Sequence, residues 1–222
     1  MKIIKKKNEN SLISAFIENF KSEILKKKKN KKRLSFVLTG GNSPKKLYTK
    51  LASSNIDWSV VDFFWGDERF VSRKSKDSNF KLANDLLIKK IKISKKNIFS
   101  INTEMISIRS SCIKYDKKIK KYFKNRKIKF DIFLLGMGKD GHIASIFPNT
   151  STLKKMFISK PIIRKDFERI TLGINIINDS KKIFLWLNKK SKAILFHKLL
   201  KKGKEIPVNN LNKKKLTCFK VS

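Results

Sequence analysis

A histidine within a glycine-rich segment is the first feature of this chain that suggests chemistry. The segment GMGKDGHIASIFP, residues 136–148, directly follows the apolar stretch Phe130–Leu135, which predicts a strand. An imidazole can take a proton from water near neutral pH and return it later. The position of His142 on such a loop therefore favours a role as general base. The other histidine, His197, lies in an apolar helical stripe, and we expect it to be structural.

The same loop offers an alternative reading as a dinucleotide-binding turn. Gly136, Gly138 and Gly141 have the spacing G-x-G-x-x-G. However, Pro148 follows too soon for the long helix that this fold requires, and the loop carries side chains that can react. The spacing alone is a weak signal, and we favour the catalytic interpretation.

Charged residues follow a second predicted strand, Val60–Trp65. The sequence continues as Gly66-Asp67-Glu68-Arg69. Burying charge is costly unless it is paired, so Asp67 and Arg69 at a strand end favour a binding or catalytic site. The alternative is a local acid–arginine pair that only orients the loop.

A third loop, TGGNSP at residues 39–44, follows the short apolar strand Leu34–Leu38. Two glycines would let the backbone approach a ligand, and the next helix would present free N–H groups to a phosphate. The Gly-Lys-Ser/Thr of a P-loop is missing. An ordinary strand-to-helix turn explains this loop equally well.

Strands and helices alternate along the whole chain. Alternation of this kind predicts an α/β fold with a doubly wound, mostly parallel, modified Rossmann-like sheet that has helices on both faces. In such a sheet ligands bind at the carboxyl ends of the strands, where all three loops lie. No repeat or linker interrupts the pattern, so we expect a single domain over residues 1–222. The remaining expected strands are 98–101, Arg169–Ile174, Ile183–Leu187 and Leu216–Val221; the main expected helices are 11–28 and 111–124.

The composition is strongly basic. Lys+Arg number 55 against 17 Asp+Glu, a formal net charge of +38. Such charge attracts polyanions, so a nucleic-acid-binding protein is one alternative. The lysines are spread along the chain, without the clustered arginines and aromatics of a dedicated module, and we expect only non-specific attraction. Two cysteines exclude a disulfide framework, and no apolar run approaches the roughly twenty residues of a membrane span. We expect a cytoplasmic protein.

Several segments together resemble one family, the 6-phosphogluconolactonases, within the wider glucosamine/galactosamine-6-phosphate isomerase group. The resemblance runs from about residue 34 to 200. Its segments are LTGGNSPKKLY (38–48), FFWGDERFV (63–71), DSNFKLA (77–83), FDIFLLGMGKDGHIASIFPNT (130–150) and, more weakly, residues 168–193.

The resemblance implies hydrolysis of 6-phospho-D-glucono-1,5-lactone, without metal or organic cofactor, by a protein that we expect to be a monomer. It makes His142 the base that activates water, and it implies that Asp140 supports this loop or orients the histidine. It places Asp67 and Arg69 in the same pocket. Arg69 would bind the substrate or stabilise the oxyanion. The phosphate would be bound by the residues that match the family's phosphate loop and its lysine: Gly40, Gly41, Asn42, Ser43 and Lys192. Arg169 lies at a strand start where the family often has arginine, and it is a weaker candidate for substrate binding.

The main rival within this group is glucosamine-6-phosphate deaminase. Its pattern has Asp-Glu-Tyr at the second strand and a carboxylate shortly after the histidine. This chain has Arg69 in place of the tyrosine and IFPNT after the loop, without a carboxylate. Asn42 departs from the small hydroxyl residue that is usual in the lactonases, but it keeps a hydrogen-bonding group.

Overall fold

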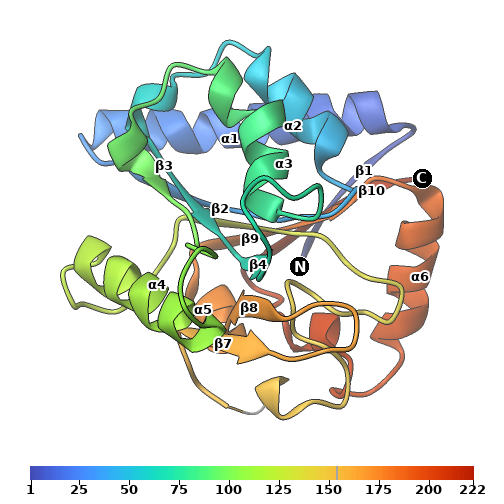
Figure 1. Ribbon diagram of the computed structural model, residues 1–222. Helices are drawn as coiled ribbons and strands as arrows, with labels where there is room; N and C mark the ends of the chain where they lie inside the picture. Colours follow the sequence, from blue (N-terminus) through green and yellow to red (C-terminus); the bar gives the residue numbers. More distant parts are fainter. Residues whose placement is uncertain (154) are drawn as a thin grey trace.

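The computed structural model of the chain describes residues 1–153 and 155–222. At its centre is a seven-stranded sheet in which every pair of neighbouring strands is parallel (Figure 1). From one edge to the other the strands are β1 (Lys2–Lys6), β10 (Leu216–Val221), β9 (Lys182–Leu187), β6 (Ile132–Leu135), β2 (Leu34–Leu38), β3 (Val61–Trp65) and β5 (Ile98–Phe99). The expected doubly wound, mostly parallel α/β sheet is confirmed.

Helices cover both faces of this sheet. In Figure 1, α1 (Glu9–Lys29), α2 (Lys45–Ala52) and α3 (Asn79–Leu86) lie above it. On the other side lie α4 (Ile108–Tyr122) and α5 (Ile174–Asp179), with α6 (Lys190–Leu200) towards the β10 end. The short 3₁₀ helices are Trp58–Val60, Ile88–Lys90, Lys95–Asn97, Ser151–Leu153 and Pro207–Asn210. The helices expected at 11–28 and 111–124 are thus present with slightly different ends.

A second, three-stranded sheet was not expected from the sequence. It is antiparallel and consists of β4 (Asp67–Arg69), β8 (Arg169–Leu172) and β7 (Ser159–Ile162), in that order. The expectation that 169–174 continue the parallel alternation was therefore wrong: the strand ends at Leu172, and α5 begins at Ile174. An apolar run shows that a segment is extended and buried, but not with which strand it pairs.

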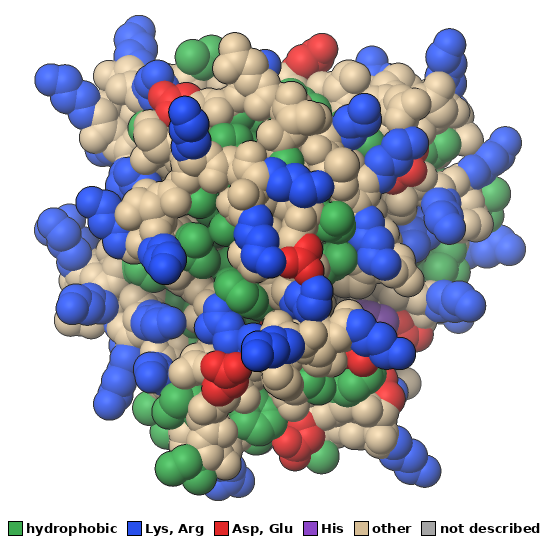
Figure 2. All heavy atoms as spheres, turned by 45° about the horizontal axis from the view of Figure 1, so that its top comes forward, with side chains coloured by type: hydrophobic (Ala, Val, Ile, Leu, Met, Phe, Trp, Pro, Cys, Tyr) green, Lys and Arg blue, Asp and Glu red, His purple; other side chains and the backbone are tan. Residues whose placement is uncertain are grey.

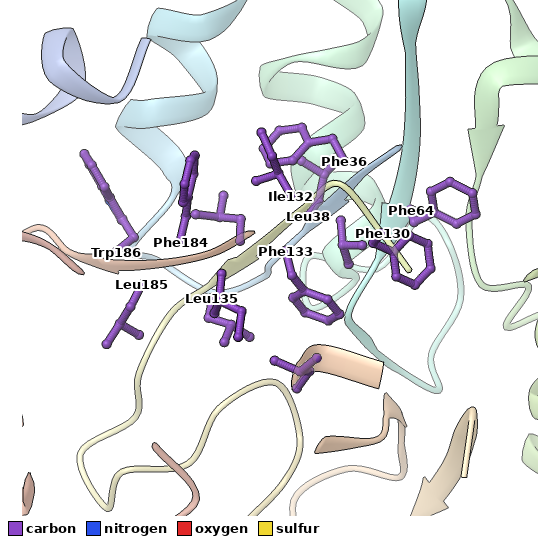
Figure 3. Close-up of a cluster of buried hydrophobic side chains, with 14 of the residues drawn as sticks. Phe36, Leu38, Phe64, Phe130, Ile132, Phe133, Leu135, Phe184, Leu185 and Trp186 are labelled. Atoms are coloured by element: carbon purple, nitrogen blue, oxygen red, sulfur yellow. The ribbon is translucent and has the colours of Figure 1, made fainter. Parts of the chain in front are cut away.

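The core is formed by large apolar side chains on both faces of the parallel sheet. Figure 3 shows Phe184 and Trp186 of β9 pointing to one face and Leu185 to the other. Phe184 and Trp186 contact Phe16 of α1, with ring centroids 5.5 and 5.7 Å apart. All five residues of β2 and of β3 are buried. This continuous burial explains why these strands are apolar runs rather than alternating patterns.

The order of the strands determines where a ligand can bind. After β2 the chain adds β3 and β5 on one side, and it then crosses to β6, β9 and β10 on the other. The loops after β2 and β6 therefore diverge at neighbouring strand ends. This topological switch point is where open α/β sheets bind ligands.

The charged side chains are dispersed on the face drawn in Figure 2. Lys and Arg side chains project over that whole face and are separated by other residues, rather than merging into one continuous patch. In the described ranges, no helix is long and apolar enough to cross a membrane.

Candidate active site

The loops at the carboxyl ends of β9, β6, β2 and β3 enclose a cavity of about 160 Å³, here called the histidine cavity. Most of the residues singled out in the sequence share it, although Gly40 and Lys192 lie 152 positions apart (192 − 40). Its lining includes Gly40, Gly41, Asn42, Ser43, Asp67, Arg69, His142 and Lys192. A second cavity of about 450 Å³, here called the α3 cavity, adjoins it and shares Gly41, Asn42, Arg69 and Asn79.

Asp140 fixes the orientation of His142. One carboxylate oxygen of Asp140 lies 2.6 Å from Nδ1 of the imidazole and also accepts the backbone N–H of His142 at 3.1 Å. Burial alone would raise the pKa of Asp140, but these contacts with His142 lower it below its usual range. An ionised Asp140 accepts the proton of Nδ1, which leaves Nε2 with a free lone pair.

The imidazole is also confined by its neighbours. A Cβ atom on Gly138 would lie 2.1 Å from Cε1 of His142, so only glycine allows the ring to lie against this backbone. The Phe147 ring packs against the imidazole with a centroid separation of 4.7 Å. Residues 136–150 form turns and bends without a helix, so the dinucleotide alternative lacks the helix that it needs.

Ser43 and Lys192 meet on another side of the histidine cavity. The Lys192 ammonium donates to Ser43 Oγ at 2.6 Å and to the carbonyl of Met137 at 3.1 Å. Burial, with a smaller contribution from Lys189, lowers the pKa of Lys192. No carboxylate in the described part of the chain forms an ion pair with this ammonium. A cation and a hydroxyl are therefore available for an anionic group.

The loop that carries Ser43 is held from below. The Tyr48 hydroxyl donates to the Thr39 carbonyl at 2.6 Å and accepts the Thr39 N–H at 3.0 Å. The indole N–H of Trp186 donates to the carbonyl of Ser43 at 3.1 Å. These contacts come from α2 and β9, so the position of the loop depends on distant elements.

The two glycines of this loop have different roles. Gly41 has φ +76° and open space beside it, so its role is conformational. Gly40 lacks a positive φ, but a Cβ atom there would lie 1.8 Å from Oδ1 of Asn79. The sequence suggested that both glycines let the backbone approach a ligand; in the structure, Gly40 makes room for Asn79.

The acidic residues of β4 bind other parts of the protein. Asp67, which is 8% exposed, accepts a hydrogen bond from the Ser145 hydroxyl at 2.7 Å. This bond links β4 to the loop of residues 136–148. Glu68 is buried and accepts the backbone N–H groups of Asn79 at 2.7 Å and Phe80 at 2.6 Å. Burial raises the pKa of Glu68 to about 7, although those N–H groups oppose the shift.

Arg69 lines both cavities and is held from two sides. Its guanidinium donates to the carbonyl of Asp77 at 2.6 Å and lies 5.7 Å from the centre of the Phe167 ring. A guanidinium has five N–H donors, so others remain for a ligand.

Arg169 lies outside the residues that line the two cavities. Its guanidinium forms two hydrogen bonds with the carboxylate of Asp166, at 2.9 and 2.5 Å, and another with the carbonyl of Phe167. Lys192, Ser43 and Arg69 are therefore better placed for substrate than Arg169. His197 lies on the exposed side of α6 next to Lys220, rather than in the apolar stripe.

Asn79 is a polar cavity residue that the sequence did not single out. It lines both cavities, is 2% exposed and begins α3. The sequence contained one signal, because Asn79 directly follows the helix cap Ser78 inside a segment that matches the family. No three His, Cys, Asp or Glu side chains in the described ranges are grouped so that they could hold a metal ion.

Comparison with known proteins supports the family resemblance. Residues 7–219 match the family described as Glucosamine-6-phosphate isomerases/6-phosphogluconolactonase. A protein of Thermotoga maritima named 6-phosphogluconolactonase is 30% identical over 195 residues, which cover 87% of this chain and 86% of that protein. One from Nostoc sp. with the same name is 33% identical over 70% of this chain and 66% of its own length.

Solved structures agree in fold. A crystal structure of 6-phosphogluconolactonase from Thermotoga maritima superposes with a TM-score of 0.87 at 29% identity, covering 99% of this chain and 98% of that one. A monomeric glucosamine-6-phosphate deaminase also superposes, with a TM-score of 0.84 at 20% identity, covering 100% of this chain and 97% of that one. The fold is therefore common to both activities and does not distinguish them.

Proposed function

Because the chain belongs to the family of glucosamine-6-phosphate isomerases and 6-phosphogluconolactonases, we propose that it is a lactonase. Its substrate is 6-phospho-D-glucono-1,5-lactone and its product 6-phospho-D-gluconate, the second step of the oxidative pentose phosphate pathway. The observation that carries the proposal is one cavity with an oriented imidazole on one loop and an available ammonium on another.

His142 acts as the general base. Asp140 holds the proton on Nδ1, so Nε2 takes a proton from water while the water oxygen attacks the lactone carbonyl carbon. The tetrahedral intermediate then collapses, the bond between that carbon and the ring oxygen breaks, and the imidazolium returns the proton to the ring oxygen. One water is consumed, and an acid and an alcohol result.

The anionic groups of substrate and intermediate require positive charge. Lys192 and the Ser43 hydroxyl are placed to bind the phosphate by charge-assisted hydrogen bonds. Arg69 lines the same cavity, and both roles that the sequence left open for it, substrate binding and oxyanion stabilisation, are compatible with this position. In the proposed mechanism Asp67 is a positioning residue, because its carboxylate is bonded to Ser145.

The deaminase alternative is disfavoured by the residues after His142. Deamination in this group uses an added carboxylate there, whereas the segment IFPNT of this chain, residues 146–150, has none. We also propose that residues 1–222 form one domain, because one continuous apolar cluster extends over both sheets.

The test compares two reactions of the purified protein. Freshly generated lactone should disappear faster than its spontaneous hydrolysis, and glucosamine 6-phosphate should release no ammonia. His142→Ala should lower kcat for the lactone by about 10²- to 10⁴-fold. His197→Ala is the matched control, since this histidine lies outside the cavity, and it should leave the rate unchanged. A wild-type rate equal to the spontaneous rate would exclude the lactonase proposal, and ammonia release would support the deaminase.

A further inference from the structure

We propose that Asn79 determines specificity, because its side-chain oxygen accepts a hydrogen bond from a hydroxyl group of the bound sugar. This inference rests on the proposed function and extends it to the sugar ring. Three observations carry it: the backbone of Asn79 is fixed, its amide can face only one way, and its oxygen is left for a ligand.

The backbone position of Asn79 is fixed by the start of α3. Glu68 accepts the N–H of Asn79 at 2.7 Å with one carboxylate oxygen and the N–H of Phe80 at 2.6 Å with the other. The Ser78 hydroxyl caps the helix by accepting the N–H of Lys81 at 3.1 Å. A side chain that begins from so constrained a backbone is preorganised for a ligand.

Asp67 fixes the orientation of the amide. The Asn79 Nδ2 group donates to the backbone oxygen of Asp67 at 3.0 Å and faces its carboxylate Oδ1 at 3.4 Å. Rotating the amide by half a turn would place its oxygen against these two oxygen atoms. The hydrogen-bond network therefore assigns nitrogen to this side and directs Oδ1 away from Asp67.

Asn79 lies where the two cavities adjoin, because it lines both. Its amide oxygen is adjacent to Gly40, whose missing side chain leaves room for it. Asn79 is 2% exposed and lines both cavities, and no donor within residues 1–153 and 155–222 bonds to its Oδ1. Among the described residues, the side-chain atoms that are both fully enclosed and without a partner do not include this oxygen, so a ligand hydroxyl can reach it and donate to it.

The chemistry of the acceptor specifies the ligand group. An amide oxygen accepts hydrogen bonds and cannot donate them, so it favours neither an ionised phosphate nor a lactone carbonyl. Those groups suit the donors Lys192 and Arg69 instead. A hydroxyl supplies the missing donor, and a site built to bond a hydroxyl rejects an analogue that lacks it.

The experiment removes the two partners separately and together. We would measure kcat/KM of the wild type and of Asn79→Ala for the phosphorylated lactone and for its 2-, 3- and 4-deoxy analogues. For the wild type, kcat/KM should be about two- to tenfold lower on the analogue that lacks the contacting hydroxyl than on the parent lactone. For Asn79→Ala, kcat/KM on the parent lactone should be lower than that of the wild type by the same factor, and it should not fall further on that analogue.

Two further variants complete the test. Gly40→Ala displaces the Asn79 side chain without removing it and should abolish the same discrimination. Asn178→Ala is the matched control, because both ends of that amide are bonded away from the cavities, to Asn210 and Asn212; it should leave all analogue ratios unchanged. Denaturant unfolding of each variant confirms that the folded protein is assayed.

The outcomes separate this inference from the proposed function. Suppose that the wild type hydrolyses the lactone and that Asn79→Ala loses as much kcat/KM on each deoxy analogue as the wild type does. This result would overturn the role of Asn79 and leave the lactonase proposal standing. If Asn79→Ala does not fold, identical losses in Gly40→Ala overturn it. Absence of wild-type hydrolysis would instead overturn the proposed function.

Discussion

The histidine cavity has two walls of different construction. The loop wall consists of the segments after β2, β6 and β9, with Ser43, His142 and Lys192. The β4–α3 wall consists of Asp67–Arg69 and the start of α3. In the loop wall the imidazole and the ammonium have polar atoms available to a ligand. In the β4–α3 wall both carboxylates are buried and bonded to other parts of the chain.

Because of this difference, we expect substitutions in the two walls to change different properties of the protein. Substitutions in the loop wall should change activity and leave folding almost unchanged, because the affected groups face the cavity. Substitution of the β4 carboxylates should change stability, because several donors depend on each of them. Asp67, Arg69 and Asn79 are the residues of the β4–α3 wall that line the histidine cavity.

Among the tests of this difference between the two walls, Lys192→Met is expected to have the largest effect. It removes the ammonium next to Ser43 and keeps the length of the side chain. We expect KM for the phosphorylated lactone to rise about 10- to 150-fold, with kcat little changed, because a charge-assisted hydrogen bond is lost. Kinetics with the unphosphorylated lactone provide the control, since that substrate should not distinguish the variant. Equal losses on both substrates would contradict phosphate binding by Lys192.

The next effect concerns the orientation of the base. Asp140→Asn keeps the shape but offers a weaker partner to Nδ1 of His142. We expect kcat to fall about tenfold or more, with the free energy of unfolding within about 0.5 kcal/mol of the wild type. Steady-state kinetics and urea unfolding measure the two quantities. The double variant with His142→Ala should be no slower than His142→Ala alone, and an additive loss would show that Asp140 acts independently.

The β4–α3 wall can be tested by pH. Burial raises the pKa of Glu68 to about 7 in the folded protein, so the folded state holds this proton over a range in which the unfolded chain releases it. The stabilisation is complete below the ordinary pKa of 4.5 and is lost as the pH rises to about 7. Relative to Glu68→Gln, the free energy of unfolding of the wild type should fall by up to about 3 kcal/mol as the pH rises through this range.

Urea unfolding at pH 5, 6, 7 and 8 measures this difference. Other carboxylates titrate in both proteins, so their contributions cancel in the comparison. A constant difference between wild type and variant over this pH range would show that Glu68 keeps an ordinary pKa.

The smallest effect is expected for the support of the loop wall. Trp186→Phe removes the indole N–H that donates to the Ser43 carbonyl and keeps an aromatic ring in the core. We expect KM to rise about two- to tenfold through the less constrained loop. An unchanged KM together with lower stability would mean that Trp186 serves only the core.

The loops that line the histidine cavity were predictable because they are local in sequence. Asp140 and His142 are two residues apart, and their contact needs only one tight turn with glycine at 138 and 141. The apolar strands before these loops were equally visible. Since parallel strands end at the same edge of a sheet, the convergence of the loops followed from the fold class.

The β4–α3 wall could not be predicted in the same way. Asp67–Arg69 was expected to be a loop, yet it pairs antiparallel with Arg169–Leu172, about a hundred residues later. A three-residue strand has no periodicity of its own, and nothing local selects its partner. For the same reason the sequence did not single out Asn79, and Arg169 was included among the substrate-binding candidates.

The α/β class, the strand-end loops and the candidate reactive side chains can be read from the sequence, because hydrophobic periodicity and turn residues act over a few positions. Which polar atoms remain free to bind a ligand depends on how distant segments pack together. The carboxylates of Asp67 and Glu68 accept hydrogen bonds from other parts of the chain, whereas the Lys192 ammonium lines the cavity and has no carboxylate partner among the described residues. A polar side chain serves a ligand or the fold according to the donors and acceptors around it, and those come from distant parts of the chain.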